Sequence, residues 1–141
     1  MKIVDKKASL FFFAGLLIVF FTVALGCEPK EMTDPKGELQ AKAAEYWDKR
    51  LMEKDYKAIY KMEMDNESVP YDEYLKRVHN LGQIGYLKIE IEDVTVDQDK
   101  GELKVKVKCN IPPVPKPIPL SIPDSWVVVN NRWKHVMPKK K

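Results

Sequence analysis

Hydrophobic and polar residues alternate strictly between Gly101 and Ile111. One parity carries the apolar side chains Leu103, Val105, Val107, Cys109 and Ile111, and the other carries Lys104, Lys106, Lys108 and Asn110. Such alternation is typical of a β-strand with one buried face and one solvated face. The stretch therefore predicts a strand in the middle of a sheet, with neighbours on both sides.

Upstream of this strand, apolar side chains recur at spacings of three and four, which is the period of amphipathic helices. Asp34 followed by Pro35 is an N-cap signature, so the first helix is expected to run from there to about Lys54. Asp55 is suited to cap a shorter second helix. A third is expected from Ser68 or Pro70 to about Leu81, where Gly82 would stop it.

The period changes to two from residue 84 onward, and apolar parity flips near Glu92-Asp93. One flip inside a long strand predicts a β-bulge there, and residues 97–101 form the turn into the central strand. Six prolines interrupt Ile111–Pro123, so we expect an extended loop or edge, because proline cannot donate to a ladder. Residues 126–129 and 132–136 should pair across an Asn130-Asn131 turn, placing Trp126, Val128, Trp133 and His135 on one face.

The N-terminus has the form of an export signal. Three lysines precede the apolar run Leu10–Leu25, and Ala24-Leu25-Gly26-Cys27 follows a pattern that resembles the bacterial lipobox. The resemblance implies cleavage between Gly26 and Cys27 and lipidation of Cys27, palmitate included, which would anchor a lipoprotein stably in a membrane. The alternative is a retained membrane helix over Ala8–Gly26, whose 19 residues are just enough to span a bilayer.

Either alternative leaves the rest of the chain outside the cytoplasm, because the lysines stay inside. We expect a signal peptide over 1–26, a tether over 27–35, one domain over 36–137 and a basic tail over 138–141. We expect the location to be the cell envelope, lipid-anchored at the cell membrane or the outer membrane and facing the periplasm or the exterior. Lipidation of Cys27 would leave Cys109 without an intramolecular disulfide partner, and its parity predicts a small buried hydrophobe.

Charge narrows the choice of partners. The formal net charge of the 141 residues is +3, and removing residues 1–26 lowers it by two. A balance this close to neutral gives no electrostatic case for nucleic acid. The pattern Asp97-x-Asp99-x-Gly101 lacks most ligands of a calcium loop. With no zinc or haem cluster and no phosphate-binding loop in the sequence, we expect neither metal nor cofactor.

Several segments together resemble the NTF2-like superfamily, notably its small bacterial lipoproteins. They are Tyr46-Trp47 with Arg50, Asp55-Tyr56 with Tyr60, Tyr71-Asp72-Glu73-Tyr74, and the hairpin from Asp124 to Trp133. The resemblance implies an α+β fold in which N-terminal helices pack on a curved antiparallel sheet, an NTF2-like or cystatin-like cone. It also implies a pocket at the wide end and frequent homodimers through the sheet, but it does not select a function.

Candidate pocket-lining residues are aromatic or imidazole side chains on the predicted inner faces: Tyr46, Trp47, Tyr60, Tyr74, Trp126, Trp133 and His135. His79 suits a helix C-terminus. Asp124 precedes Trp126 and could enter the cavity, but a turn or strand-start role is favoured. Spacing pairs no base with a partner, so no catalytic set is assigned. We therefore expect a lipid-anchored module that binds a protein or a small apolar ligand. The alternatives are an uncharacterised isomerase- or hydrolase-like enzyme using His135, or an accessory subunit of a membrane complex.

Overall fold

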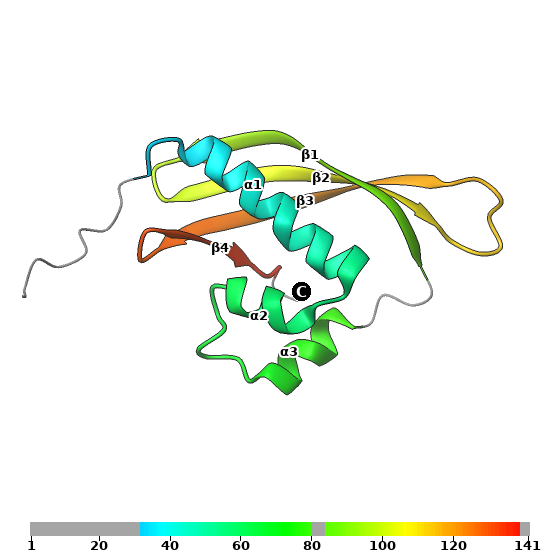
Figure 1. Ribbon diagram of the computed structural model, residues 1–141, viewed down its shortest axis with the longest axis horizontal. Helices are drawn as coiled ribbons and strands as arrows, with labels where there is room; N and C mark the ends of the chain where they lie inside the picture. The colour runs from blue at the N-terminus through cyan, green and yellow to red at the C-terminus, as the bar shows by residue number, and fades with distance from the viewer. Residues whose placement is uncertain (1–31, 80–83, 139–141) are drawn as a thin grey trace, which may run out of the picture. The chain divides into compact units, whose positions relative to one another are not determined.

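A computed structural model describes residues 32–79 and 84–138, which belong to one compact unit, Glu31–Lys141. Helices precede a four-stranded antiparallel sheet in the order β1-β2-β3-β4 (Figure 1), which confirms the α+β class. The elements are α1 (Pro35–Asp48), the π-helical segment η2 (Lys49–Glu53), α2 (Tyr56–Met62), α3 (Tyr71–Val78), β1 (Gly85–Asp97), β2 (Lys100–Asn110), β3 (Ile118–Val129) and β4 (Arg132–Val136).

The first two helices begin where the sequence predicts. Asp34 Oδ1 accepts a hydrogen bond from the Gly37 backbone N–H at 3.0 Å, and Asp55 caps α2 in the same way through Ala58 at 3.1 Å. The expected helix to Lys54 is not α-helical throughout, because α1 gives way to η2 after Asp48. Lys54 then adopts φ 57°, a left-handed conformation that ends the segment.

The central strand has the predicted alternation. Every second residue of β2 is buried, Leu103, Val105, Val107 and Cys109 among them. β1 pairs along one edge of β2 and β3 along the other. The register of β1 shifts between Glu92 and Thr95, and Asp93 has φ 53°, so the bulge is confirmed. A second irregularity, between Tyr86 and Lys88, is not apparent in the sequence pattern.

The loop formed by the proline-rich segment is shorter than one of the two expectations. β3 begins at Ile118, so the loop alternative is wrong for Ile118–Pro123, whereas the edge alternative fits, because these six residues pair with β2 alone. Pro119 and Pro123 lie inside β3 and pair in register with β2. β4 pairs with β3 only from Ser125 onward, so this part of β3 has one open edge. Prolines of one parity are tolerated there, because the missing N–H groups can face that edge.

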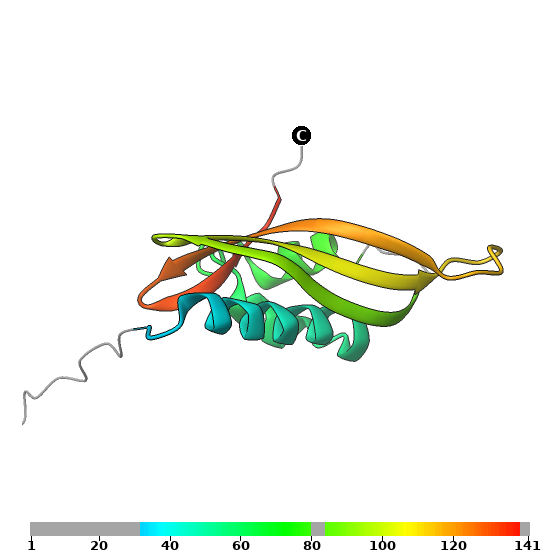
Figure 2. The same cartoon turned by 90° about the horizontal axis from the view of Figure 1, so that it is seen from above.

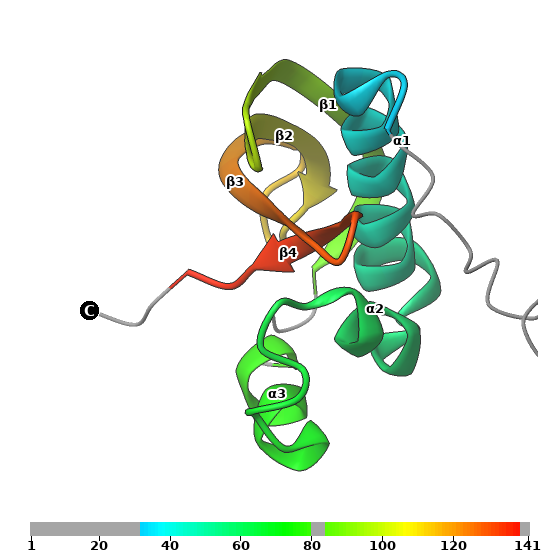
Figure 3. The same cartoon turned by 90° about the vertical axis from the view of Figure 1, so that its left-hand side faces the viewer.

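The helices cover the inner face of the sheet. α1 runs along β1, with α2 and α3 beyond it, and the strands curve across the same face (Figures 2 and 3). The final hairpin has the predicted register, with Trp126 opposite His135 and Val128 opposite Trp133. The core comprises Leu39, Ala43, Tyr46, Trp47, Leu51, Ile59, Met62, Tyr74, Val78, Val94, Leu103, Val105, Val107, Trp126 and Trp133.

Several sequence-based predictions lie outside the described residues. They are the export signal with its Gly26-Cys27 cleavage site, the Gly82 stop and the lysines 139–141. Among the helices of residues 32–79 and 84–138, none combines the length and hydrophobicity needed to cross a membrane.

Candidate functional site

His135 on β4 lies between two carboxylates that come from distant parts of the chain. Its Nδ1 is 2.7 Å from Glu63 Oε2, and its Nε2 is 2.8 Å from Asp124 Oδ1. Glu63 follows α2 directly, and Asp124 lies within β3. The three side chains are almost fully buried, with residue exposures of 1% for His135, 2% for Glu63 and 5% for Asp124.

The remaining oxygens of both carboxylates accept hydrogen bonds from aromatic side chains. Glu63 Oε1 accepts from the Tyr46 hydroxyl at 2.5 Å and the Tyr74 hydroxyl at 2.9 Å. Asp124 Oδ2 accepts from the indole Nε1 atoms of Trp47 and Trp126, both at 2.8 Å. We call Glu63, Asp124, His135 and these four aromatic residues the histidine network.

The geometry favours a doubly protonated imidazole. A carboxylate can only accept, so both ring nitrogens of His135 must donate if both acids are ionised. Burial lowers the pKa of His135, but hydrogen bonds and charges from Asp124 and Glu63 outweigh burial and leave that pKa above 6.5. Burial raises the pKa of Asp124, but His135 and the two indole donors outweigh it and hold that pKa below 3.8.

Arg50 supplies the fourth charge. Its Nη1 donates to the Tyr46 hydroxyl at 3.3 Å, which in turn donates to Glu63. Its guanidinium carbon lies 4.9 Å from the Trp47 ring centroid, within cation–π range. With both acids ionised and His135 protonated, two cations and two anions alternate along one chain of contacts, so their charges cancel. Buried charge is tolerated when it is paired in this way.

Aromatic packing fixes the imidazole further. The Tyr46 ring stacks on His135 at 4.3 Å, and the Trp126 ring meets it edge-on at 5.4 Å. Burial raises the pKa of Tyr46 well above 10.0, against the charge of Arg50 and together with that of Glu63. Burial and then Glu63 raise the pKa of Tyr74 as well. Both hydroxyls therefore stay neutral donors at ordinary pH.

The histidine network is sealed as well as satisfied. Both imidazole nitrogens and all four carboxylate oxygens have protein partners. The cavity that borders Glu63 and Tyr74 has a volume of about 10 Å³, which is about the minimum for one water molecule. A general base needs an accessible lone pair within hydrogen-bond reach of its substrate. His135 offers none in this arrangement.

Most of the predicted pocket-lining residues meet in the histidine network. Tyr46, Trp47, Tyr74, Trp126 and His135 come together there, from α1, α3, β3 and β4. Tyr60 does not join them, since its hydroxyl contacts the carbonyl oxygens of Asn66 and Val69, both at 2.5 Å. Trp133 instead borders a surface depression. His79 caps the C-terminus of α3, as expected.

Sequence reasoning missed Glu63 and preferred the wrong role for Asp124. The expectation of a turn or strand-start role for Asp124 is wrong, because the residue is buried within β3 and opposes Leu103 of β2. Glu63 lies between Met62 and Met64, and a lone acid between apolar residues is the one local signal it gives. The Met64 N–H donates to the His135 carbonyl at 2.8 Å and fixes the approach of Glu63 to β4.

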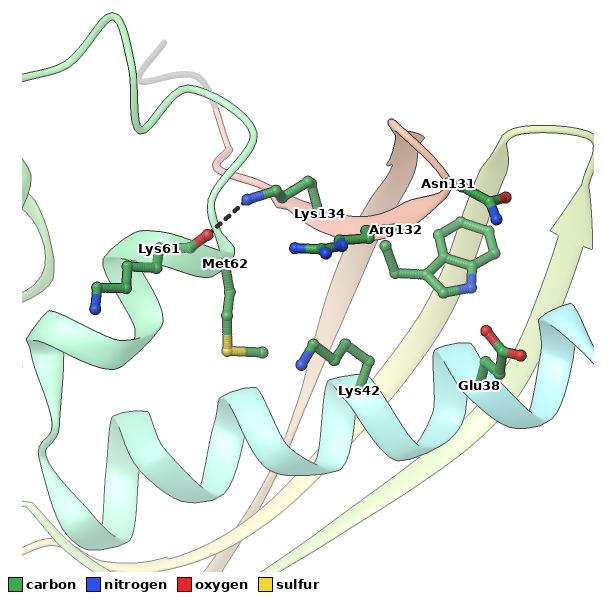
Figure 4. Close-up of a pocket in the computed structure, with 8 residues that line it drawn as sticks. Glu38, Lys42, Lys61, Met62, Asn131, Arg132 and Lys134 are labelled. Atoms are coloured by element: carbon green, nitrogen blue, oxygen red, sulfur yellow. Dashed lines mark hydrogen bonds between the residues drawn. The ribbon is translucent and has the colours of Figure 1, made fainter. Parts of the chain in front are cut away.

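A second feature lies on the surface beside β4. A depression of about 390 Å³ is lined by Glu38, Lys42, Lys61, Met62, Asn131, Arg132, Trp133 and Lys134 (Figure 4). Three of its ammonium or guanidinium groups come from β4 and α1. Within residues 32–79 and 84–138, no group of three His, Cys, Asp or Glu side chains is placed to hold a metal ion.

Comparisons with known proteins inform the fold alone. No family model matches the chain, and no curated protein matches it in sequence. Among solved structures, it is similar to a SEC-C motif containing protein from Rhodopseudomonas palustris, with a TM-score of 0.50 and 11% identity. The match covers 73% of this chain and 75% of the other. At this identity the similarity shows a shared arrangement of helices and sheet.

Proposed function

We propose that this protein is an extracytoplasmic binding or interaction module of the NTF2-like type, held at a membrane by lipid on Cys27. The observation that favours this role over an enzymatic one is the closure of the histidine network, in which each nitrogen of His135 contacts a carboxylate. A site built for proton transfer would keep one of these atoms open to a substrate. A site built to fix three helices against a sheet would not.

The NTF2-like part of the proposal is supported by the order of elements, which is the order that the resemblance implies. Helices precede the strands, β1 carries the predicted bulge, and the last hairpin turns at Asn130 and Asn131 with φ of 50° and 59°. The lipid anchor is supported by the lipobox-like stretch Ala24-Leu25-Gly26-Cys27. A homodimer through the outer face of the sheet belongs to the same proposal. Lys104 and Lys106 on that face pair with Asp93 and Glu92 of their own chain.

The anchor is tested by metabolic labelling with palmitate and by intact mass. The wild type should incorporate label and lose the mass of residues 1–26, whereas Cys27→Ser should incorporate none. Cys109→Ser is the matched control and should label like the wild type, because Cys109 is buried. Equal labelling of Cys27→Ser would refute the anchor. An unlabelled chain that keeps residues 1–26 would support the retained helix instead.

The enzyme alternative rests on one observation, the carboxylate within hydrogen-bond reach of His135. For His135 to act as a base, it would have to release Asp124 or Glu63 and open to solvent. Reaction of His135 with diethyl pyrocarbonate in the folded protein, at a rate close to that of a free imidazole, would favour this alternative. Protection of His135 while the C-terminal-cap residue His79 reacts would support the binding module.

A further inference from the structure

The depression beside β4 gathers positive charge at one end. Lys42 comes from α1, and Arg132 and Lys134 come from β4; we call the space that they border the basic depression. In Figure 4 the side chains of Lys42, Met62 and Arg132 surround a common space, while Glu38 lies at the opposite end. An anion entering at the Lys42 end would meet several positive groups before it met Glu38.

The three cations of the basic depression differ in the contacts that they make with the rest of the protein. Lys42 Nζ is 2.8 Å from Glu45 Oε2 in an exposed pair, and Lys134 Nζ donates to the Lys61 carbonyl at 2.6 Å. Arg132 is exposed and forms no ion pair with any residue in the described part of the chain. A guanidinium presents a planar fork of donors that matches phosphate or carboxylate oxygens.

The inner wall of the basic depression contributes an apolar surface. Trp133 is 4% exposed, and its Nε1–H has no acceptor within the described ranges. That nitrogen has almost no exposed surface, so the wall offers a ligand apolar contact rather than a hydrogen-bond donor. A volume of about 390 Å³ falls within the range of small-ligand sites, which favours a compact headgroup over a long peptide.

We propose that the basic depression binds the phosphate group of an anionic membrane lipid. This inference rests on the proposed lipid anchor, because the anchor brings the depression within reach of a bilayer. The seven Cα–Cα steps from Cys27 to Asp34 span at most about 25 Å. Lys42 lies two turns into α1, about 10 Å further along the helix. Charge, pocket size and tether length therefore agree on a headgroup as the ligand.

The test uses the full chain, purified from membranes and placed in nanodiscs. One set of discs contains phosphatidylcholine only, and the other contains added phosphatidylglycerol. Lysines are acylated with an amine reagent, and the rate at each position is read by mass spectrometry. Lys61 is a control within the same region, because its ammonium points away from the depression in Figure 4. Lys108 on β2 is a distant control.

Acylation of Lys42 and Lys134 should slow about threefold in the anionic discs, as expected at two-thirds occupancy, with Lys61 and Lys108 unchanged. Equal slowing at all four lysines would contradict a specific site and indicate only the surface potential. Protection by soluble glycerol phosphate in phosphatidylcholine discs would overturn the lipid as the source. No protection under any condition would refute the site.

Two charge-matched variants sharpen the test. Arg132→Glu should weaken headgroup binding about tenfold, the loss expected for one charge-assisted contact, and restore acylation of Lys42. Lys108→Glu changes the net charge equally and should leave the protection intact; loss of protection in both variants would contradict the proposal. Intact mass of the same samples reports lipid on Cys27. Unprotected lysines on an acylated chain would refute the headgroup site and leave the anchor standing.

Discussion

The two faces of β4 carry the same kind of side chain in opposite settings. His135 points into the core and is 1% exposed, held by one carboxylate at each ring nitrogen. Arg132 is exposed and Lys134 is half-buried, and they border the basic depression. Within five residues, one strand therefore presents a fully paired imidazole inside and incompletely paired cations outside.

The difference shows how burial decides the role of a charge. Inside, a charge without a partner costs several kcal/mol, so each charged group must be matched. The matching groups come from α1, the segment after α2, and β3, so the histidine network fixes β4 relative to all of them. Outside, water solvates each cation, so the groups stay available to a partner of opposite charge.

The largest expected effect is on the inner face. Asp124→Ala would leave His135 Nε2 and the indole donors of Trp47 and Trp126 without an acceptor. Removing one partner of a buried ion pair costs about 3–5 kcal/mol, so we expect a loss of that size in the free energy of unfolding by urea. Glu92→Ala, which removes an exposed pair with Lys106, is the control and should change little. Equal stability of the two variants would contradict a stabilising role for the histidine network.

A pair of tryptophan substitutions sharpens the comparison while keeping an aromatic side chain at each position. Trp47 and Trp133 are equally buried, at 4% exposure, but only Trp47 donates to a carboxylate. Trp47→Phe should cost about 1–3 kcal/mol, the range for an unsatisfied or lost buried hydrogen bond. Trp133→Phe should cost clearly less, because it removes no such bond. Thermal or urea unfolding measures both, and a reversed order would argue against the assigned hydrogen bonds.

The pH dependence of stability should follow from His135 and Asp124. The pKa of His135 is raised on folding, so its contribution is complete below about 6.5 and is lost as pH rises through the higher folded value. The pKa of Asp124 is lowered, so its contribution is present above about 3.8 and is lost as pH falls through the lower folded value.

Urea unfolding should therefore show stability declining above pH 6.5, by no more than about 1.4 kcal/mol per pH unit for one proton. His135→Gln should flatten this decline. His79→Gln is the matched control and should retain it, because His79 caps α3 outside the network. A decline of the same slope in His135→Gln would assign the effect to another group.

The smallest effect is expected on the outer face. Arg132→Ala should change the free energy of unfolding by no more than about 0.5 kcal/mol, as is usual for exposed positions without paired partners. The same variant should impair headgroup binding. A large loss of stability would show that Arg132 has a structural role and would weaken the contrast between the two faces.

Local patterns predict most of the fold. Alternation identifies β2, the parity flip at Glu92-Asp93 identifies the bulge, and paired asparagines identify the last turn. The strand over Ile118–Pro123 escapes prediction, because prolines dominate its local signal while its pairing depends on an edge that β4 leaves open. The π-helical segment after Asp48 gives no pattern of its own.

The site is less accessible to such reasoning. The aromatic residues and His135 can be nominated because their spacing places them on inner faces. Glu63 lies 72 residues from His135 in the chain, and the contact depends on how the segment after α2 meets β4. A local sequence pattern does not predict this long-range contact. The sequence pattern predicts a strand over 126–129 only, and Asp124 lies before it. The burial of Asp124 follows only once β3 is known to begin at Ile118.

The charge state of His135 tests the central claim most directly. Imidazole ¹⁵N chemical shifts in the folded protein, followed through neutral pH, report whether one or both ring nitrogens carry a proton. We predict that His135 is doubly protonated at pH 7, with both nitrogens donating to carboxylates. A neutral His135 at pH 7, with one nitrogen unprotonated, would contradict the paired-charge network.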